Sequence, residues 1–229
     1  MKTIGLIGGM SWESSAQYYA IINRAVRERL GGAHSAEILL YSLDFGEIER
    51  LQRDGAWASL TARMVDAARR LEAGGADFVL ICSNTMHLMA DDVSAAIGVP
   101  LLHVVDPTAA AVRRAGLSRI GLLGTAFTME KAFYRDRLAA AGIETLIPDA
   151  DDRREVHRVI YEELVAGKTE AASRAAYREV IARLVARGAQ AIVLGCTEIM
   201  LLVDQSDSAV PLFDTTSLHA LAAVDLALD

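Results

Sequence analysis

Residues 75–85, GADFVLICSNT, form the stretch that decides the fold, because a closely similar stretch returns at residues 188–198 as GAQAIVLGCTE. Each copy runs from a glycine through an apolar segment of strand length to a cysteine, and polar residues follow. The chain has two cysteines, Cys82 and Cys196, and both lie here. We therefore expect each thiol at the end of a strand and the start of a helix, a frequent position for functional groups in α/β proteins.

A second pair of segments repeats at nearly the same distance. Residues 4–10 (IGLIGGM) resemble residues 120–126 (IGLLGTA), an offset of 116 positions (120 − 4), and the cysteines are 114 positions apart (196 − 82). A repeat of half the chain predicts an α/β protein with two similar lobes related by a pseudo-twofold axis. Regular strand and helix alternation makes each sheet mainly parallel and flanked by helices. The axis would bring the two cysteines to face each other in an active site between the lobes.

The predicted first lobe contains residues 1–104 and 209–229, and the second contains residues 105–208. This division rests on the likeness of segments 100–108 and 210–216, in which a strand pattern is followed by Asp and Thr and then by a helical pattern. The likeness predicts that the terminal strand and helix both pack on the first lobe. Within the second lobe, the pattern predicts helices over 128–141, 154–166 and 170–187.

Composition excludes several classes of partner. The chain is 52% hydrophobic and carries a formal net charge of −7, with no block of Lys or Arg. These values indicate a compact globular protein and argue against nucleic acid or an anionic membrane as a partner. The N-terminus runs directly into a strand pattern and no apolar run has transmembrane length, so we expect a cytoplasmic protein.

The cysteines fit free thiols better than a disulfide or a metal site. In a reducing compartment, a matched pair at the ends of core strands indicates free thiols. Cys82 and His87 are five positions apart, and no comparable ligand lies near Cys196, so no metal site is expected.

Other polar residues have ordinary explanations beside the functional ones. Gln52 and Arg53 lie in a polar segment that mostly resembles a solvated charged face. His87 is a secondary acid or base candidate, although a lone His at a helix start more often caps or packs, and His103 is expected in the core. Lys168 follows a glycine at a helix end, where a lysine ordinarily complements the helix dipole.

Two symmetric thiols are suited to a reaction at a stereocentre. One group removes a proton from carbon while the other returns a proton from the opposite face, and a thiol with a reference pKa of about 8.5 can serve in either role. Helix N-termini after Cys82 and Cys196 are expected to depress the thiol pKa values, and their N–H groups could bind a substrate carboxylate.

Three motifs carry a resemblance to a known family. Residues 8–13 (GGMSWE), 82–87 (CSNTMH) and 195–198 (GCTE) resemble the aspartate/glutamate racemases, and the likeness spans essentially the whole chain. The resemblance implies a two-lobed α/β fold, a homodimer, and an isomerase that interconverts L- and D-amino acids by a two-base mechanism. It implies no pyridoxal phosphate or other cofactor, and a small amino acid as the binding partner.

The resemblance also assigns roles to single residues. Cys82 and Cys196 match the proton donor and acceptor pair. Matches to the groups that hold the α-carboxylate and amine are Ser83, Asn84, Thr85 and Thr197; further substrate contacts are Met10, Gln52, Thr125, Lys168 and Glu198. The first turn is more similar to the aspartate or broad-specificity branch, because Gly9 and Met10 stand where cell-wall glutamate racemases usually have an Asp-Ser pair.

Some alternatives stay open at this stage. A related cysteine-dependent isomerase or decarboxylase would use one thiol, a redox protein would use the pair as a disulfide, and a non-catalytic amino-acid-binding protein would tolerate the loss of either. The sequence also leaves open which amino acid is the substrate, and whether Lys168 or Arg53 would face a side-chain carboxylate.

Overall fold

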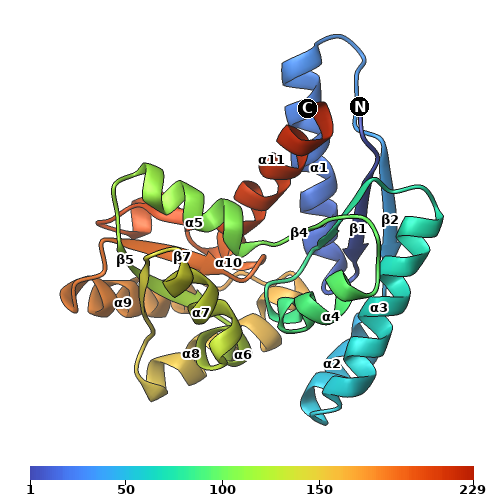
Figure 1. Cartoon of the computed structure of the whole chain (residues 1–229). Coiled ribbons are helices and arrows are strands. Elements are labelled where there is room, and N and C mark those ends of the chain that lie inside the picture. Colours follow the sequence, from blue (N-terminus) through green and yellow to red (C-terminus); the bar gives the residue numbers. More distant parts are fainter. The chain divides into compact units, whose positions relative to one another are not determined.

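The computed structural model describes all 229 residues, which form two compact α/β units (Figure 1). Unit 1 contains Met1–Val104 and His219–Asp229, and unit 2 contains Val105–Leu218. Each unit has one four-stranded sheet in which every neighbouring pair is parallel, with the orders β2-β1-β3-β4 and β6-β5-β7-β8. The predicted fold class is therefore confirmed, and the internal repeat is visible as one strand order used twice.

The elements of unit 1 are the strands β1 (Ile4–Gly8), β2 (Ile38–Ser42), β3 (Phe78–Ile81) and β4 (Leu101–Leu102), the helices α1 (Trp12–Leu30), α2 (Phe45–Arg53), α3 (Trp57–Ala73) and α4 (Ala90–Ala95), and the 3-10 helix η1 (Thr85–Met89). Helix α11 (Thr215–Leu228) begins in unit 2, and its residues from His219 onward belong to unit 1.

The elements of unit 2 are the strands β5 (Arg119–Gly124), β6 (Glu144–Leu146), β7 (Ala191–Gly195) and β8 (Leu212–Asp214), the helices α5 (Val105–Arg114), α6 (Ala126–Glu130), α7 (Ala132–Ala140), α8 (Ala150–Glu162), α9 (Ala171–Ala186) and α10 (Ile199–Leu202), and the 3-10 helices η2 (Leu164–Ala166) and η3 (Gln205–Asp207). The single helix expected over 128–141 is two helices, because Lys131 between them has extended backbone angles.

Both faces of the sheet in unit 1 are covered by helices. Alternate residues of the central strands point to opposite sides: Leu6 and Leu80 pack with α1 and α11, while Ile7 and Ile81 pack with α3. In Figure 1, α11 lies beside α1 on one side of this sheet. The central strands β1 and β3 are thereby fully buried, and the carboxyl ends of the strands are left to carry polar residues.

The structure differs from the expected division at the C-terminal side. Strand β8 pairs with β7 in unit 2, with Leu212 opposite Ile192 and Asp214 opposite Leu194, so residues 209–218 belong to unit 2 rather than to the first lobe. The exchange between units involves helices alone. Helix α5 follows β4 of unit 1 but belongs to unit 2, and α11 follows β8 of unit 2 but belongs to unit 1 from His219 onward. The fourth strand of each sheet stays in the unit of that sheet.

Candidate functional site

In unit 1, the first glycine turn follows β1 at the carboxyl edge of the sheet. The Gly9 N–H donates to Ser15 Oγ at 2.8 Å. Gly9 has a φ of +84°, and a Cβ there would overlap the backbone of Leu43, so this turn requires glycine. Met10 follows it and is buried with a 6% exposed fraction. The turn is therefore held against Leu43, the residue that follows the neighbouring strand β2.

Cys82 directly follows β3 and is fully buried. Its N–H donates to the Ile7 carbonyl at 2.9 Å, which holds the residue against β1. Burial raises the pKa of the Cys82 thiol above its ordinary value. The expected depression of this pKa by a following helix is wrong, because the following helix η1 has only five residues and burial dominates.

The polar residues after Cys82 lie together in one buried segment. Ser83, Asn84 and Thr85 are exposed by 8% or less. Gln52 of α2 is also buried, and its amide Nε2 donates to the Met86 sulfur at 3.3 Å, so the structure places Gln52 against the Cys82 segment. Unit 1 therefore brings Gln52 together with the residues that the 82–87 motif singled out.

Arg53, the neighbour of Gln52, is exposed to solvent. Its side chain is 66% exposed and pairs with Glu49 at 3.5 Å on the outer face of α2. The solvated charged face that the sequence favoured for this residue is what the structure shows. Arg53 is thereby separated from the buried Gln52 by the turn of the helix.

In unit 2, Cys196 directly follows β7 and has an acidic partner. Its Sγ donates to Glu198 Oε2 at 3.0 Å, and Thr197 Oγ1 donates to the same oxygen at 2.8 Å. All three residues are buried. Burial, and next the negative charge of Glu198, raise the pKa of the Cys196 thiol well above its ordinary value, so the expected depression is wrong here too.

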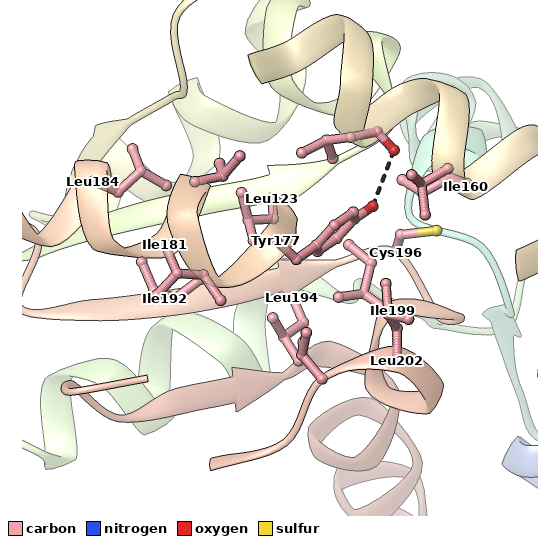
Figure 2. Packing of buried hydrophobic residues seen from close by; sticks show 14 of the residues in the cluster. Leu123, Ile160, Tyr177, Ile181, Leu184, Ile192, Leu194, Cys196, Ile199 and Leu202 are labelled. Carbon is pink, nitrogen blue, oxygen red and sulfur yellow. Dashed lines mark hydrogen bonds between the residues drawn. The ribbon is translucent and has the colours of Figure 1, made fainter. Parts of the chain in front are cut away.

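The backbone of Cys196 is held by a well-packed core. Figure 2 shows Tyr177 of α9 beside Cys196, with its hydroxyl donating to the Val156 carbonyl at 3.0 Å. Leu194 precedes Cys196 in the chain and Ile199 follows it, and all three belong to one apolar cluster. The Cys196 sulfur lies at the rim of this cluster (Figure 2). Close packing of this kind restricts the sulfur to a narrow range of positions.

Thr125 occupies the turn after β5, next to Cys196. Strands β5 and β7 are paired so that Gly124 lies opposite Gly195, which places Thr125 and Cys196 at the same sheet edge. Thr125 caps α6, with Oγ1 accepting from the Thr128 N–H at 3.2 Å.

Sequence reasoning missed His157 of α8, whose Nδ1 accepts from the Ala126 N–H at 3.1 Å. Burial lowers the pKa of His157, so it is neutral and holds the turn of Thr125. No sequence signal marks it, because His157 lies mid-helix and the contact joins residues 31 positions apart.

Lys168 lies on an exposed loop at the end of η2. Gly167 before it has a φ of +70°, and the Lys168 N–H donates to the Glu163 carbonyl at 3.0 Å, which closes the loop. Leu164 of η2 packs in the same core as Ile199 of α10, the helix that follows the Cys196 segment. The ammonium is therefore carried on the exposed loop that follows η2.

His87 and His103 are both buried in unit 1, so the expected core position of His103 agrees with its burial. No helix has the length and apolar character needed to cross a lipid bilayer.

Three known proteins are similar to this chain over all or nearly all of its length. A crystal structure of a candidate Asp/Glu racemase from Yersinia pestis has 53% sequence identity and a TM-score of 0.93, covering 100% of both chains. That of PH1733, an aspartate racemase homologue from Pyrococcus horikoshii OT3, has 32% identity and a TM-score of 0.86, also covering 100% of both chains. The broad specificity amino-acid racemase RacX of Bacillus subtilis is 23% identical over an alignment 228 residues long, which covers 96% of this chain and 96% of that protein.

The family model described as Asp/Glu/Hydantoin racemase matches residues 7–223. This match covers both cysteine segments and both glycine turns. The chain therefore belongs to the Asp/Glu/hydantoin racemase family of isomerases.

Proposed function

We propose that the protein is a cofactor-independent amino-acid racemase in which Cys82 and Cys196 are the two bases. The observation that carries the proposal is their equivalent position. Cys82 follows β3 and Cys196 follows β7, and these strands occupy the same place in two sheets of identical order. Equivalent bases on two equivalent units are what proton transfer on opposite faces of one carbon requires.

The proton balance of the proposed reaction is simple. One cysteine enters as thiolate and takes the α-proton, while the other enters as thiol and gives its proton to the opposite face of the carbanion. The roles of the two cysteines are then exchanged, and the enzyme is ready for the other enantiomer. Because both thiol pKa values are raised, the thiolate is a minor species in the free protein at neutral pH, and the rate should increase as the pH rises above neutrality.

The remaining candidate residues would bind the amino acid. Backbone and side-chain donors of Ser83, Asn84, Thr85 and Thr197 suit the α-carboxylate and amine, and Met10, Gln52 and Thr125 would be further substrate contacts. The bonds from Cys196 and Thr197 to Glu198 favour a role for that carboxylate on the thiol rather than on the substrate.

The experiment follows α-proton exchange in deuterium oxide with each enantiomer, without added pyridoxal phosphate or metal. The wild-type protein should racemise the substrate and exchange both enantiomers. Cys82→Ser and Cys196→Ser should each abolish racemisation, because a hydroxyl is far less acidic than a thiol, and each variant should exchange only the enantiomer that its remaining thiol deprotonates. A variant that still racemises at the wild-type rate, or an activity that chelation abolishes, contradicts the proposal.

The substrate is proposed to be aspartate, glutamate or a wider set of amino acids, as the names of the similar proteins suggest. An acidic substrate needs a local cation, and Lys168 suits that role better than the ion-paired Arg53. Lys168→Ala should lower turnover of aspartate about ten-fold or more relative to a neutral analogue such as homoserine. An equal loss with both substrates would exclude this role of Lys168.

A further inference from the structure

Three buried histidines surround one short segment of unit 1. His87 of η1 lies with its ring centroid 4.5 Å from that of His103 and 5.8 Å from that of His219. The exposed fractions of the three residues are 6% or less. His103 directly follows β4 and precedes Val104, the last residue of the first part of unit 1.

The hydrogen bonds of His87 define its tautomer. Its Nε2 lies 3.1 Å from the Val104 backbone nitrogen, which can only donate, so Nε2 must be the bare acceptor. Its Nδ1 lies 2.7 Å from the Ser83 carbonyl oxygen, which can only accept, so Nδ1 carries the proton. Neutral His87 therefore joins the backbone of Ser83 to that of Val104 with both ring nitrogens.

His219 holds the same segment from another side. Its Nε2 donates to the Leu102 carbonyl at 2.8 Å, and its Nδ1 accepts from the Tyr18 hydroxyl at 2.9 Å. The backbone at Leu102 and Val104 is thus anchored by α11 and α1 as well as by η1. The Ser83 carbonyl is tied through His87 to this anchored segment.

We propose that His87 is a positioning residue for Cys82, acting through its bond to the Ser83 carbonyl. Strand β3 ends at Ile81, directly before Cys82, so the strand hydrogen bonds hold the backbone on the N-terminal side of the cysteine. Ser83 is the next residue on its C-terminal side. The His87 bond fixes the other side. A catalytic base must be held to within about 0.5 Å of its productive position. A displacement of about 1 Å can lower the rate on the order of 100-fold.

This inference rests on the proposed two-cysteine function, and it predicts a one-sided defect. The Gln amide can replace Nε2 as the acceptor for Val104 but leaves the Ser83 carbonyl without its donor. The Asn amide can replace Nδ1 as the donor to Ser83. His87→Gln should therefore lower kcat about ten-fold or more with little change in KM, and His87→Asn should retain most of the activity.

The decisive measurement is α-proton exchange with each enantiomer. His87→Gln should slow exchange only for the enantiomer whose exchange is abolished by Cys82→Ser. The matched control is His34→Gln, the same substitution at an exposed histidine of unit 1, and it should leave the exchange rates of both enantiomers unchanged. Equal slowing of both enantiomers by His87→Gln, or equal defects in the Gln and Asn variants, would overturn the proposal.

A second readout is independent of racemisation. In a Cys196→Ser chain labelled with carbon-13 at cysteine Cβ, the NMR spectrum reports Cys82 alone, because the chain has only two cysteines. Adding His87→Gln should shift or broaden this signal, and adding His87→Asn should leave it near its original position. An unchanged signal in the Gln variant would refute the positioning role even if the chain proved to lack racemase activity.

Discussion

At the scale of single residues, the two cysteines have equivalent positions but different surroundings. Cys82 belongs to an apolar cluster that includes Leu6 and Leu80, whereas Cys196 donates to the buried carboxylate of Glu198. The carboxylate stabilises the protonated thiol in two ways: it accepts a hydrogen bond from the thiol, and its negative charge repels the thiolate. The duplicated fold therefore contains one thiol whose proton is held by burial and one whose proton is also held by a neighbour.

Glu198→Gln should lower the pKa of Cys196. The amide oxygen can still accept a hydrogen bond, but the negative charge that opposes the thiolate is gone. The measurement is the NMR titration of carbon-13-labelled Cys196 in a Cys82→Ser chain, where it is the one cysteine left. Glu179→Gln, a change at a 73% exposed side chain of α9, is the control and should not move the titration. An unchanged midpoint in Glu198→Gln would show that no negative charge on Glu198 opposes the Cys196 thiolate.

At the scale of elements, one central strand in each unit ends in a glycine directly before a segment of candidate site residues. Strand β1 ends at Gly8 and β7 ends at Gly195, immediately before the first glycine turn and before Cys196. A Cβ on Gly195 would lie 2.8 Å from Leu122 Cδ1 and 2.9 Å from the Leu123 carbonyl oxygen. The close approach of β7 to β5 at this point therefore depends on glycine, and so does the position of the next residue.

Gly195→Ala should reduce the free energy of unfolding by about 1–3 kcal/mol, because the backbone oxygen of Leu123 cannot move aside as a flexible side chain can. Denaturation in urea measures the change. Gly46→Ala in α2 is the matched control, since its Cβ would meet no atom closer than 3.6 Å and alanine is the better helix former. Racemase activity should fall in Gly195→Ala by more than the stability loss explains, because Cys196 must shift with the strand. A Gly195→Ala chain as stable as the wild type would contradict the argument.

At the scale of the whole molecule, the chain passes between the units twice, after Val104 and after Leu218. Helix α5 follows the fourth strand of unit 1 and belongs to unit 2, and α11 follows the fourth strand of unit 2 and belongs to unit 1 from His219 onward. Two chain crossings therefore link the units. The homodimer and the cytoplasmic location stay predictions at this scale. Sedimentation of the purified chain would check the first of them.

Stability should decline at alkaline pH through the buried thiols. Their folded pKa values are raised, so the folded state binds these protons more tightly than the unfolded state does. The stabilisation is complete below the unfolded thiol pKa of about 8.5 and is lost as the pH rises beyond it. Thermal unfolding across this range should show a steeper loss for the wild type than for Cys82→Ala/Cys196→Ala. His157→Asn is the control: its lowered pKa affects stability only as the pH falls below about 6.5, so its alkaline limb should match that of the wild type.

The sequence by itself determined the features that depend on the local order of apolar and polar residues. The repeat around Cys82 and Cys196 predicted two parallel sheets with a thiol at the end of a central strand in each, and the structure has both thiols directly after β3 and β7. This works because an apolar run followed by polar capping residues is a local signal, and a strand and its following helix are neighbours in the chain.

Only the tertiary structure decided which segments meet. Strand β8 could pair with either sheet by its pattern, because backbone hydrogen bonds carry no sequence label, and its pairing with β7 followed from the packed whole. The same holds for His87, whose partners Ser83 and Val104 include one 17 positions away, and for the thiol pKa values, which burial raised against the local expectation. Burial and long-range contacts depend on the complete fold, and a short stretch of sequence contains neither.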